Sequence, residues 1–585
     1  MSHGINVLNL TTQNDNVVMT GSAYSLVFCG DRPFVRVFSS GGDLITELFV
    51  FSSVHPLNGR DETYEAGEWI FRDIPGGMEA CVAANSTAWA SKLYRFSCFP
   101  DRFTYTVEVE GHAELAEALY FGGYYSASLR WSSGFFWSGQ EFRQVFNPEP
   151  NVPEVFHHHP GSTTKIDLMG VPLPAKGDWF FTPPPFCFAG DYGNGWLALG
   201  VEARPGENLF SEYHYHGSLK AFYLSLSYEG HTQVRGRYVL PAIGFDFAAD
   251  EYQALAAHVS ALKAAGFAPT VQREETPAWW RTPIFCGWGS QCYLAELDGG
   301  KAPDYARQMH YERFLEALEE NRLQPGIVVL DDKWQATYGE NLVDETKWPD
   351  LRGFIERQHQ AGRRVLLWLK AWDPEGVPVE ECVTHQGGGA VAVDPTNPAY
   401  ERRLRAAVRR MLSTDGYNAD GFKIDFSARI PSGPGLRSFG RVWGLELMKR
   451  YLDILYSEAK LVKPDALIMA HTPHPYLADM VDMIRLNDIN VGQDVVRAMR
   501  HRARVATIAL PHAIIDTDNW PVTDRQSWRD YLAVQTELGV PSLYYSTHID
   551  RTREPLEASD YELIRESWSR FPLADLKTSN AKQEV

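Results

Sequence analysis

The chain has 585 residues, more than one hydrophobic core normally holds, so we expect at least two domains. Its net charge of −19 at pH 7 argues against nucleic acid and against an anionic membrane surface as partners. The 7 cysteines show no metal-ligand spacing, and the first residues have neither a basic nor an apolar leader pattern, so we expect a cytoplasmic protein.

The first part of the chain has the pattern of an all-β domain. Short runs rich in β-branched and aromatic residues, such as residues 24–29, 103–109 and 222–228, are separated by Gly, Asn, Asp and Pro. This spacing predicts a β-sandwich. Within it, the histidine triplet 157–159 precedes Pro-Gly and predicts a surface turn.

A helix and a linker are expected to follow the sandwich. Residues 250–267 place apolar side chains at helical spacing, with Asp250 positioned to cap the helix start. We therefore expect an N-terminal β-sandwich domain with its connecting helix over residues 1–265, and a polar linker over residues 266–282.

From residue 283 the pattern changes to strands alternating with helices. Amphipathic helices are predicted at residues 351–362, 400–411 and 439–455. The strand candidates are residues 283–288, 327–332, 364–370, 421–426, 466–471, 483–488, 505–510 and 541–545. Eight β/α units over residues 283–550 predict a (β/α)8 TIM barrel, followed by a C-terminal segment, 551–585. The expected fold class is therefore multidomain, an N-terminal β-sandwich followed by a (β/α)8 barrel.

Polar and aromatic residues recur at the predicted carboxyl ends of these strands, where barrels carry their chemistry. Carboxylates interleaved with Trp suggest a polar pocket with aromatic walls, which suits a carbohydrate. The residues concerned are Trp288, Asp331, Asp332, Trp334, Trp368, Lys370, Trp372, Asp373, Lys423, Asp425, His471, Arg485, Asp488, Asp516, Asp518 and Trp520.

The predicted strand at residues 421–426 carries the most informative pair. Lys423 and Asp425 alternate with apolar residues, so both charges point to one face. A buried pair of this kind could simply close the barrel. Alternatively, a carboxylate kept ionised by a neighbouring cation is suited to attack an anomeric carbon, while a second carboxyl group protonates the leaving oxygen.

Four segments of the sequence resemble the clan D retaining α-glycosidases, above all the glycoside hydrolase family thirty-six α-galactosidases. Phe422-Lys423-Ile424-Asp425 resembles their nucleophile strand, and Leu330-Asp331-Asp332-Lys333-Trp334 resembles the strand whose two Asp hold sugar hydroxyls. Leu367-Trp368-Leu369-Lys370 stands where they have a strand with an aromatic-acidic end. The segment from Arg485 to Asp488 is similar to the one that carries an Arg and the acid/base Asp in the related family twenty-seven.

The resemblance implies a retaining α-glycoside hydrolase that acts by a covalent glycosyl-enzyme intermediate, most like an α-galactosidase-like exo-enzyme on small oligosaccharides or glycosides. It implies Asp425 as nucleophile and Asp488 as acid/base, with Asp516 and Asp518 as competing candidates for the second role. Sugar binding is implied for Asp331, Asp332, Lys423, Arg485 and Trp288, and the strand-end position adds Trp368, Lys370 and His471.

This sequence departs from the family pattern at Lys333, which replaces a Gly, at Lys370, and at Ala470-His471-Thr472-Pro473. The two lysines either pair with local acids such as Asp373 or Asp344, or one of them binds an anionic substituent of the sugar.

Other functions stay open at this point. They are an α-glycosidase for a charged or other hexoside, a glycosyl-transferring relative of raffinose synthase, and a non-catalytic carbohydrate-binding barrel. No metal and no organic cofactor is expected, because both catalytic groups are protein carboxylates. The expected partner is a carbohydrate substrate, and whether the chain forms a homo-oligomer is left open.

Overall fold

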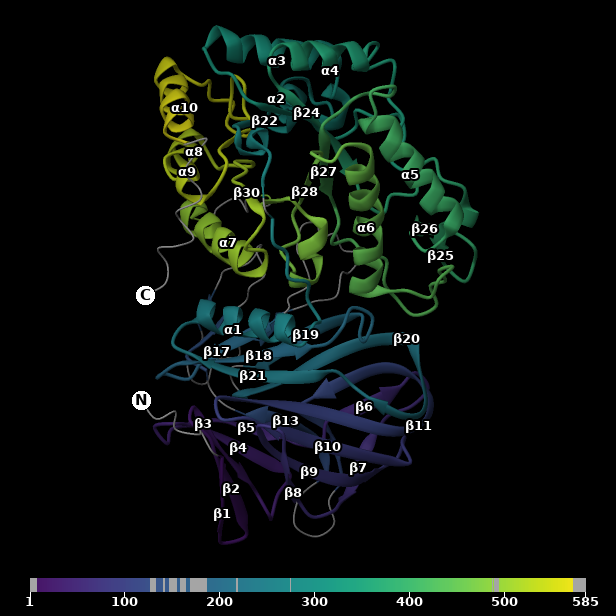
Figure 1. Cartoon of the computed structure of the whole chain (residues 1–585), viewed down its shortest axis with the longest axis vertical. Coiled ribbons are helices and arrows are strands. Elements are labelled where there is room, and N and C mark those ends of the chain that lie inside the picture. Colours follow the sequence, from purple (N-terminus) through teal and green to yellow (C-terminus); the bar gives the residue numbers. More distant parts are fainter. Residues whose placement is uncertain are drawn as a thin grey trace.

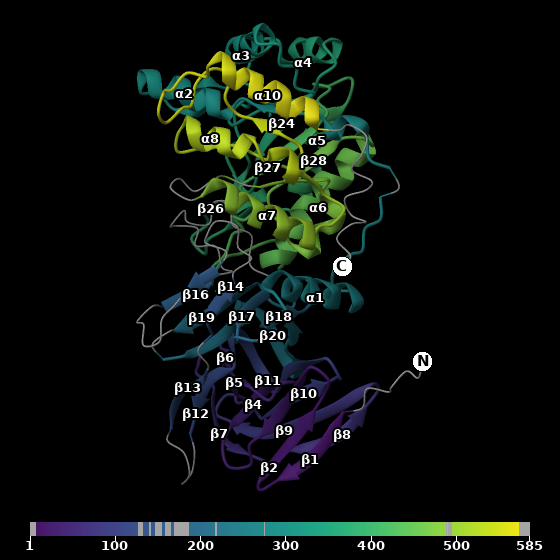
Figure 2. The same ribbon diagram turned by 90° about the vertical axis from the view of Figure 1, so that its left-hand side faces the viewer.

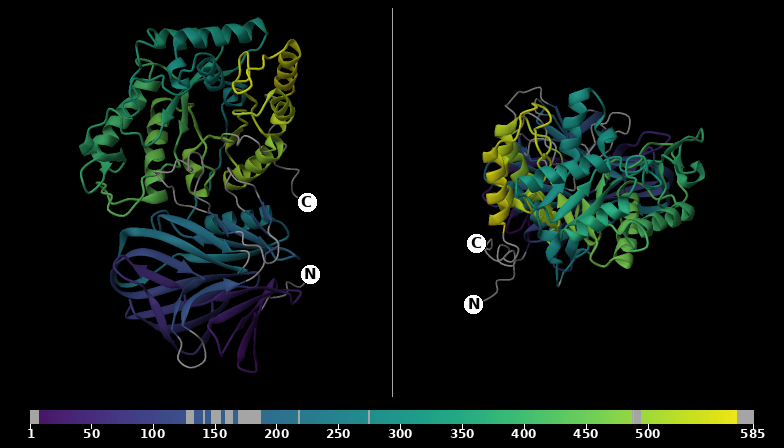
Figure 3. Two further views of the ribbon diagram at one scale, coloured as in Figure 1. Left: turned by 180° about the vertical axis from the view of Figure 1, so that it is seen from behind. Right: turned by 90° about the horizontal axis from the view of Figure 1, so that it is seen from above.

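The structure is a computed structural model that describes residues 8–126, 133–139, 142–146, 155–157, 165–168, 187–216, 219–273, 275–486, 488 and 494–571. Figure 1 shows strands from the first part of the chain in the lower half and helices surrounding short strands in the upper half. The views from the side and from behind show the same division (Figure 2, Figure 3). No helix within these ranges is both long and apolar enough to cross a membrane.

The lower half is strand-rich, as expected. Its 21 described strands form one connected, mainly antiparallel network, and the expected runs at 24–29, 103–109 and 222–228 fall in β3, β11 and β20. A division into two sandwich layers stays a prediction. The strands are β1 Asn9–Gln13, β2 Asn16–Thr20, β3 Tyr24–Phe28, β4 Phe34–Ser39, β5 Leu44–Phe49, β6 Ser53–Pro56, β7 Glu62–Ala66, β8 Ile70–Ile74, β9 Gly77–Ser86, β10 Ser91–Cys98, β11 Arg102–Tyr120, β12 Gly122–Tyr125, β13 Gly134–Gly139, β14 Gln144–Phe146, β15 Val155–His157, β16 Lys165–Leu168, β17 Cys187–Asp191, β18 Trp196–Glu202, β19 Phe210–His216, β20 Ala221–Val239 and β21 Ala242–Ala248.

The expected surface turn at the histidine triplet is only partly within the described residues. His157 ends β15, and His158 and His159 lie outside the described residues.

The predicted connecting helix is confirmed as α1, Glu251–Ala264. The Asp250 side chain accepts hydrogen bonds from the backbone N–H groups of Tyr252 and Gln253, which caps the helix start as expected. Figure 1 shows α1 lying between the strand-rich half and the barrel half. Its buried Leu255 and Val259 belong to one apolar cluster that joins strands β17 to β19 with barrel strands and helices.

The upper half contains an eight-stranded parallel sheet that is nearly closed into a barrel. The sheet order runs β30-β29-β28-β27-β24-β23-β22-β31, and a parallel bridge between Asp516 and Val540 brings the two ends together. The strands are β22 Ile284–Cys286, β23 Ile327–Leu330, β24 Arg364–Lys370, β27 Gly421–Asp425, β28 Leu467–Ala470, β29 Met483–Arg485, β30 Ile514–Asp516 and β31 Ser542–Leu543. A separate hairpin consists of β25 Cys382–Thr384 and β26 Ala390–Val393.

Helices follow most barrel strands and cover the outside of the sheet (Figure 1, Figure 3). They are α2 Trp288–Asp298, α3 Gln308–Glu320, α4 Leu351–Gln360, α5 Pro398–Leu412, α6 Gly444–Val462, α7 Val495–Ala509, α8 Arg525–Leu532, α9 Gln535–Leu538 and α10 Ala558–Arg570. Short 3-10 turns occur at Ala278–Arg281, Ala302–Tyr305, Val379–Glu381 and Pro475–Met480.

The predicted seventh strand, residues 505–510, is wrong. This segment is almost entirely the end of helix α7, and the seventh strand is β30. The apolar run is part of a longer helical pattern, because Val495, Met499, Ala503 and Ala506 are buried at spacings of three or four residues. The Asp494 side chain caps the helix by accepting from the Arg497 N–H.

Candidate active site

Strand β27 delivers two charged side chains to the carboxyl end of the barrel. Lys423 is buried, and its Nζ donates to Asp331 Oδ2 at 2.7 Å, just after β23. The Cys286 thiol, at the end of β22, donates to the same oxygen at 3.0 Å. Burial lowers the pKa of Lys423, but Asp331 and Cys286 outweigh it and raise that pKa above its usual range. Lys423 and Asp331 therefore form a buried ion pair at the carboxyl end of the barrel.

The carboxylate of Asp425, the last residue of β27, accepts hydrogen bonds from three different residues. It accepts from Trp368 Nε1 at 3.1 Å, from the Phe426 N–H at 3.1 Å and from Arg485 Nη2 at 3.1 Å. His471 Nε2 lies 3.5 Å from the same carboxylate. Burial raises the pKa of Asp425, but Arg485, His471 and Lys423 together hold it below its usual value. Asp425 is therefore a carboxylate at neutral pH.

Arg485, at the end of β29, joins three carboxylates. Its Nη1 lies 2.6 Å from Asp488 Oδ1 and 2.7 Å from Asp518 Oδ2, while its Nη2 contacts Asp425. Only 1% of its side chain is exposed, so these pairs are shielded from water. One guanidinium thus brings Asp425 and Asp488 to the same small region of the site.

Asp488 differs from Asp425 in its proton affinity. Burial raises the pKa of Asp488 to about 7, and Asp518 and Asp425 add to this effect against the opposing effect of Arg485. Two neighbouring carboxyl groups whose pKa values are pushed in opposite directions are the arrangement expected of a nucleophile and a proton donor.

The competing acid/base candidates are more enclosed. The side chain of Asp488 is 18% exposed, whereas that of Asp518 is 0% exposed. Asp516 is buried at the end of β30 and accepts from the Asp518 N–H at 3.0 Å and from the Ser542 hydroxyl. Asp518 in turn accepts from the Trp520 N–H at 2.9 Å. Asp516 and Asp518 are thus hydrogen-bonded within the protein, burial raises the pKa of Asp516 to about 6, and Asp488 has the most exposed side chain of the three.

Asp332 carries a contact that the sequence did not indicate. The hydroxyl of Tyr338 donates to Asp332 Oδ1 at 2.8 Å. Burial raises the pKa of Asp332 to about 7, although Tyr338 and Lys370 lower it. Tyr338 lies in the loop after β23, where no motif marks it, so sequence reasoning missed it.

Lys333 and Lys370, the two lysines noted in the sequence analysis, each have a carboxylate partner. Lys370 Nζ lies 2.8 Å from Asp373 Oδ2, which confirms the expected pairing with that acid. Lys333 Nζ lies 2.6 Å from Glu375 Oε2, a partner that the sequence analysis did not name. Neither lysine is deeply buried, since their side chains are 24% and 19% exposed.

The remaining predicted site residues line the same end of the barrel. Trp288 begins α2, and its ring packs edge-on against Trp520 with centroids 5.7 Å apart. Trp520 Nε1 donates to Asp550 at 2.9 Å. His471 Nε2 lies 3.2 Å from the hydroxyl of Ser427, which extends the polar group around Asp425. Trp520 was among the residues named from the sequence, whereas Ser427 was not, although its position just after the end of β27 was an available signal.

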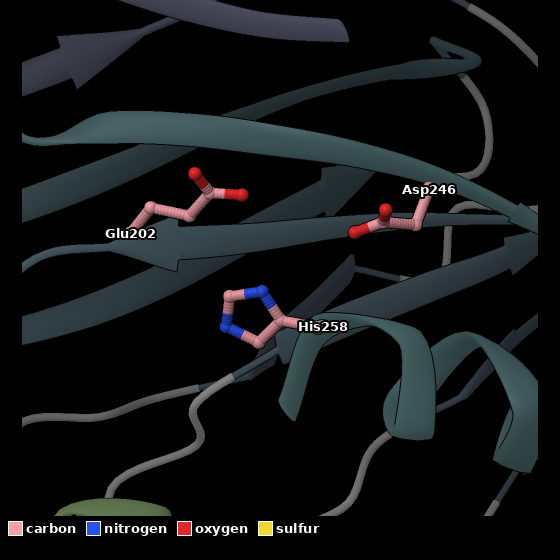
Figure 4. A group of neighbouring side chains, drawn as sticks. All are labelled: Glu202, Asp246 and His258. Atoms are coloured by element: carbon pink, nitrogen blue, oxygen red, sulfur yellow. The ribbon is translucent and has the colours of Figure 1, made fainter. Parts of the chain in front are cut away.

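A second group of titratable residues lies outside the barrel. Glu202 on β18, Asp246 on β21 and His258 on α1 point toward one another, with ligand atoms within 4.8 Å (Figure 4). Such a set could hold a divalent cation. However, Arg102 makes ion pairs with both carboxylates, at 2.9 Å to Asp246, so a cation there would compete with a guanidinium. Glu202 and Asp246 therefore form an ion-pair network with Arg102, next to His258 of α1.

Several solved structures of glycosidases have a fold similar to that of this chain. A solved GH31 family sulfoquinovosidase from E. rectale superposes with a TM-score of 0.58 at 9% identity, over 96% of this chain and 82% of that one. An α-galactosidase from Thermus thermophilus gives 0.51 at 13% identity, over 85% and 99%. A GH31 dextranase from Flavobacterium johnsoniae gives 0.52 at 11% identity, over 97% and 69%. At these identities the likeness concerns the fold.

Sequence comparison adds one short match. No family model matches the chain. The α-xylosidase XylQ of Lactiplantibacillus pentosus is 24% identical over 139 residues, which are 20% of this chain and 18% of that protein. The match therefore spans less than a fifth of the length of that relative.

Proposed function

We propose that the chain is a retaining α-glycoside hydrolase whose nucleophile is Asp425 and whose acid/base is Asp488. The observation that carries this proposal is Arg485, which contacts both carboxylates while their pKa values are shifted apart. Retaining glycosidases hold their two carboxyl groups about 5–5.5 Å apart, and the contact of both Asp425 and Asp488 with the one Arg485 guanidinium supports their proximity here.

The proposed reaction has two steps. Asp425 attacks the anomeric carbon while protonated Asp488 donates its proton to the departing oxygen, which leaves a glycosyl ester on Asp425. Asp488 then removes a proton from water, and the resulting hydroxide attacks the same carbon and releases Asp425. Two inversions give net retention of configuration. Arg485 and Trp368 stabilise the Asp425 carboxylate in the free enzyme and again when it leaves.

The substrate proposed is a neutral α-hexoside, with α-galactoside first. The α-xylosidase, the sulfoquinovosidase, the α-galactosidase and the dextranase named above support α-glycosides as the substrate class. Because Lys333 and Lys370 each have a carboxylate partner, neither needs an anionic substituent to balance its charge. We assign sugar hydroxyls to Asp331, Asp332 and Lys423, and the pocket walls to Trp288, Trp368 and His471.

We also propose that the chain is most similar to the family thirty-six α-galactosidases. In this proposal the barrel, residues 283–550, is the catalytic domain. Transfer to an acceptor sugar would use the same covalent intermediate, so product analysis with and without added acceptor separates hydrolysis from transglycosylation.

The test is trapping of the intermediate. An activated 2-deoxy-2-fluoro or 5-fluoro α-glycoside should label Asp425, as seen by peptide mass spectrometry, and Asp425→Ala should lose turnover that azide restores on an aryl glycoside. Labelling of another residue contradicts the assignment of Asp425. Wild type that turns over none of a panel of aryl α-glycosides, yet binds the free sugars, would instead favour the non-catalytic alternative.

A further inference from the structure

Tyr338 is the centre of a contact group at the mouth of the site. The ammonium nitrogens of Lys333 and Lys370 both lie over its ring, 3.7 and 4.2 Å from the centroid. At these distances each cation is attracted to the negative face of the ring. The ring is therefore held by these two lysine side chains.

The backbone around Tyr338 is fixed by the loop that follows β24. Glu375 Oε2 accepts from the Tyr338 N–H at 3.0 Å and from Lys333 Nζ at 2.6 Å. The next N–H, of Gly339, donates to the Glu375 carbonyl at 2.9 Å. A side chain at Gly339 would meet Val377 Cγ2 at 2.5 Å and the Glu375 carbonyl oxygen at 2.7 Å, so this close approach requires glycine. The loops after β23 and β24 are thus hydrogen-bonded to each other next to Tyr338, which fixes the backbone of that residue.

The hydroxyl of Tyr338 faces Asp332. By donating to Oδ1 at 2.8 Å, it occupies one oxygen of that carboxyl group and fixes its plane. Burial and Asp332 raise the pKa of Tyr338, so the phenol stays a proton donor. Its ring also lies 5.9 Å from that of Trp368, whose Nε1 donates to Asp425. Tyr338 therefore contacts Asp332, the proposed sugar-binding acid, and also Trp368, which hydrogen-bonds to the proposed nucleophile Asp425.

We propose that Tyr338 is a positioning residue for sugar recognition, which presents the second oxygen of Asp332 to one hydroxyl of the sugar. Lys333 and Lys370 act by holding the ring, and their paired carboxylates on the facing loop keep them in place. This inference rests on the proposed function, and it deepens it by naming the residue that sets discrimination at one hydroxyl.

The experiment compares wild type with Tyr338→Phe and with Tyr64→Phe, a matched control whose exposed tyrosine lies on β7. The substrates are an aryl α-hexoside and its monodeoxy analogues, and the readouts are KM, kcat and the pH profile of kcat/KM. Dissociation constants for the free hexose and its deoxy forms are measured by calorimetry in parallel.

The expected result is a fall in kcat/KM of about ten-fold or more for the full substrate, since hydrogen bonds to charged groups are worth this much. The loss should appear mainly in KM, and it should shrink for the one deoxy analogue that lacks the hydroxyl bound by Asp332. Without the phenol, the pKa of Asp332 rises, so the acid limb of kcat/KM should move to higher pH. Tyr64→Phe should behave as wild type.

An equal loss for every deoxy analogue, with an unchanged pH profile, would reduce Tyr338 to a structural residue. Unchanged kinetics and unchanged sugar binding would overturn the proposal outright. Should wild type bind sugars without turning over any glycoside, the proposed function fails, but the calorimetric series still decides whether Tyr338 governs recognition.

Discussion

Replacing Arg485 by Met should destabilise the protein strongly and in a pH-dependent way. The guanidinium contacts Asp425, Asp488 and Asp518 and is 1% exposed. Removing one partner of a buried ion pair costs about 3–5 kcal/mol, because the remaining charge stays buried without compensation. Here three carboxylates lose the same partner, so we expect the upper end of that range at pH 8.

The sign of the pH dependence follows from Asp425. Although burial raises its pKa, Arg485 is the largest of the influences that bring it below its usual value, so ionised Asp425 adds stability above its unfolded pKa. That contribution is lost as the pH falls through the folded pKa. Without Arg485, burial raises the pKa of Asp425 and further raises that of Asp488. The difference between variant and wild type should therefore be largest at pH 8 and shrink toward pH 5, where the carboxyl groups take up protons.

Urea unfolding followed by tryptophan fluorescence at pH 5, 6.5 and 8 measures this difference. The control is Arg357→Met, whose guanidinium pairs with Glu312 and Asp350 but is 46% exposed, so a loss of at most about 1 kcal/mol is expected. If Arg485→Met costs less than the control, or costs the same at all three pH values, the assignment of Arg485 as the shared counter-ion is wrong.

Three further outcomes follow from the site. Asp488→Asn should slow glycosides with poor leaving groups far more than activated aryl glycosides and should remove the decline of kcat/KM above pH of about 7; equal slowing of both would indicate a binding role. Gly339→Ala should lower the free energy of unfolding by about 1–3 kcal/mol through steric overlap, whereas Gly387→Ala, where a Cβ meets nothing within 4 Å, should not. Wild type should show no preference for a 6-sulfonate or 6-uronate over the neutral α-galactoside, and Lys370→Met should affect both alike, because Asp373 already balances that lysine; a marked preference for the charged sugar would contradict this reading.

The barrel could be predicted largely because its strands are apolar runs that end in polar residues. Residues 421–426 illustrate this, since the alternation of Lys423 and Asp425 with apolar neighbours located β27 and its charged pair. The run at 505–510 failed because a short apolar segment fits a buried helix as well as a strand. Only the buried positions upstream in α7 distinguish the two.

Site residues could be predicted from the sequence where they stand at the end of a barrel strand, but not where they lie within a loop. Asp331, Asp425 and Arg485 follow the first rule, and the structure brings them together. Tyr338 follows the second, because its role depends on two loops that meet only in the folded chain. For the same reason the partner of Lys370 could be named three residues away, whereas Glu375, the partner of Lys333, could not.

The apolar cluster that joins the strand-rich half to the barrel through α1 bears on how the chain folds and unfolds. Cys187, Trp196 and Phe210 from the strand-rich half share one buried cluster with the barrel, through Leu255 and Val259. Cutting the chain near residue 270 would expose this shared surface on the barrel fragment, which should then aggregate when expressed alone. Because both halves share this buried cluster, they should unfold together on heating and give a single calorimetric peak. The strand-rich half would then stabilise the barrel as an intramolecular folding partner.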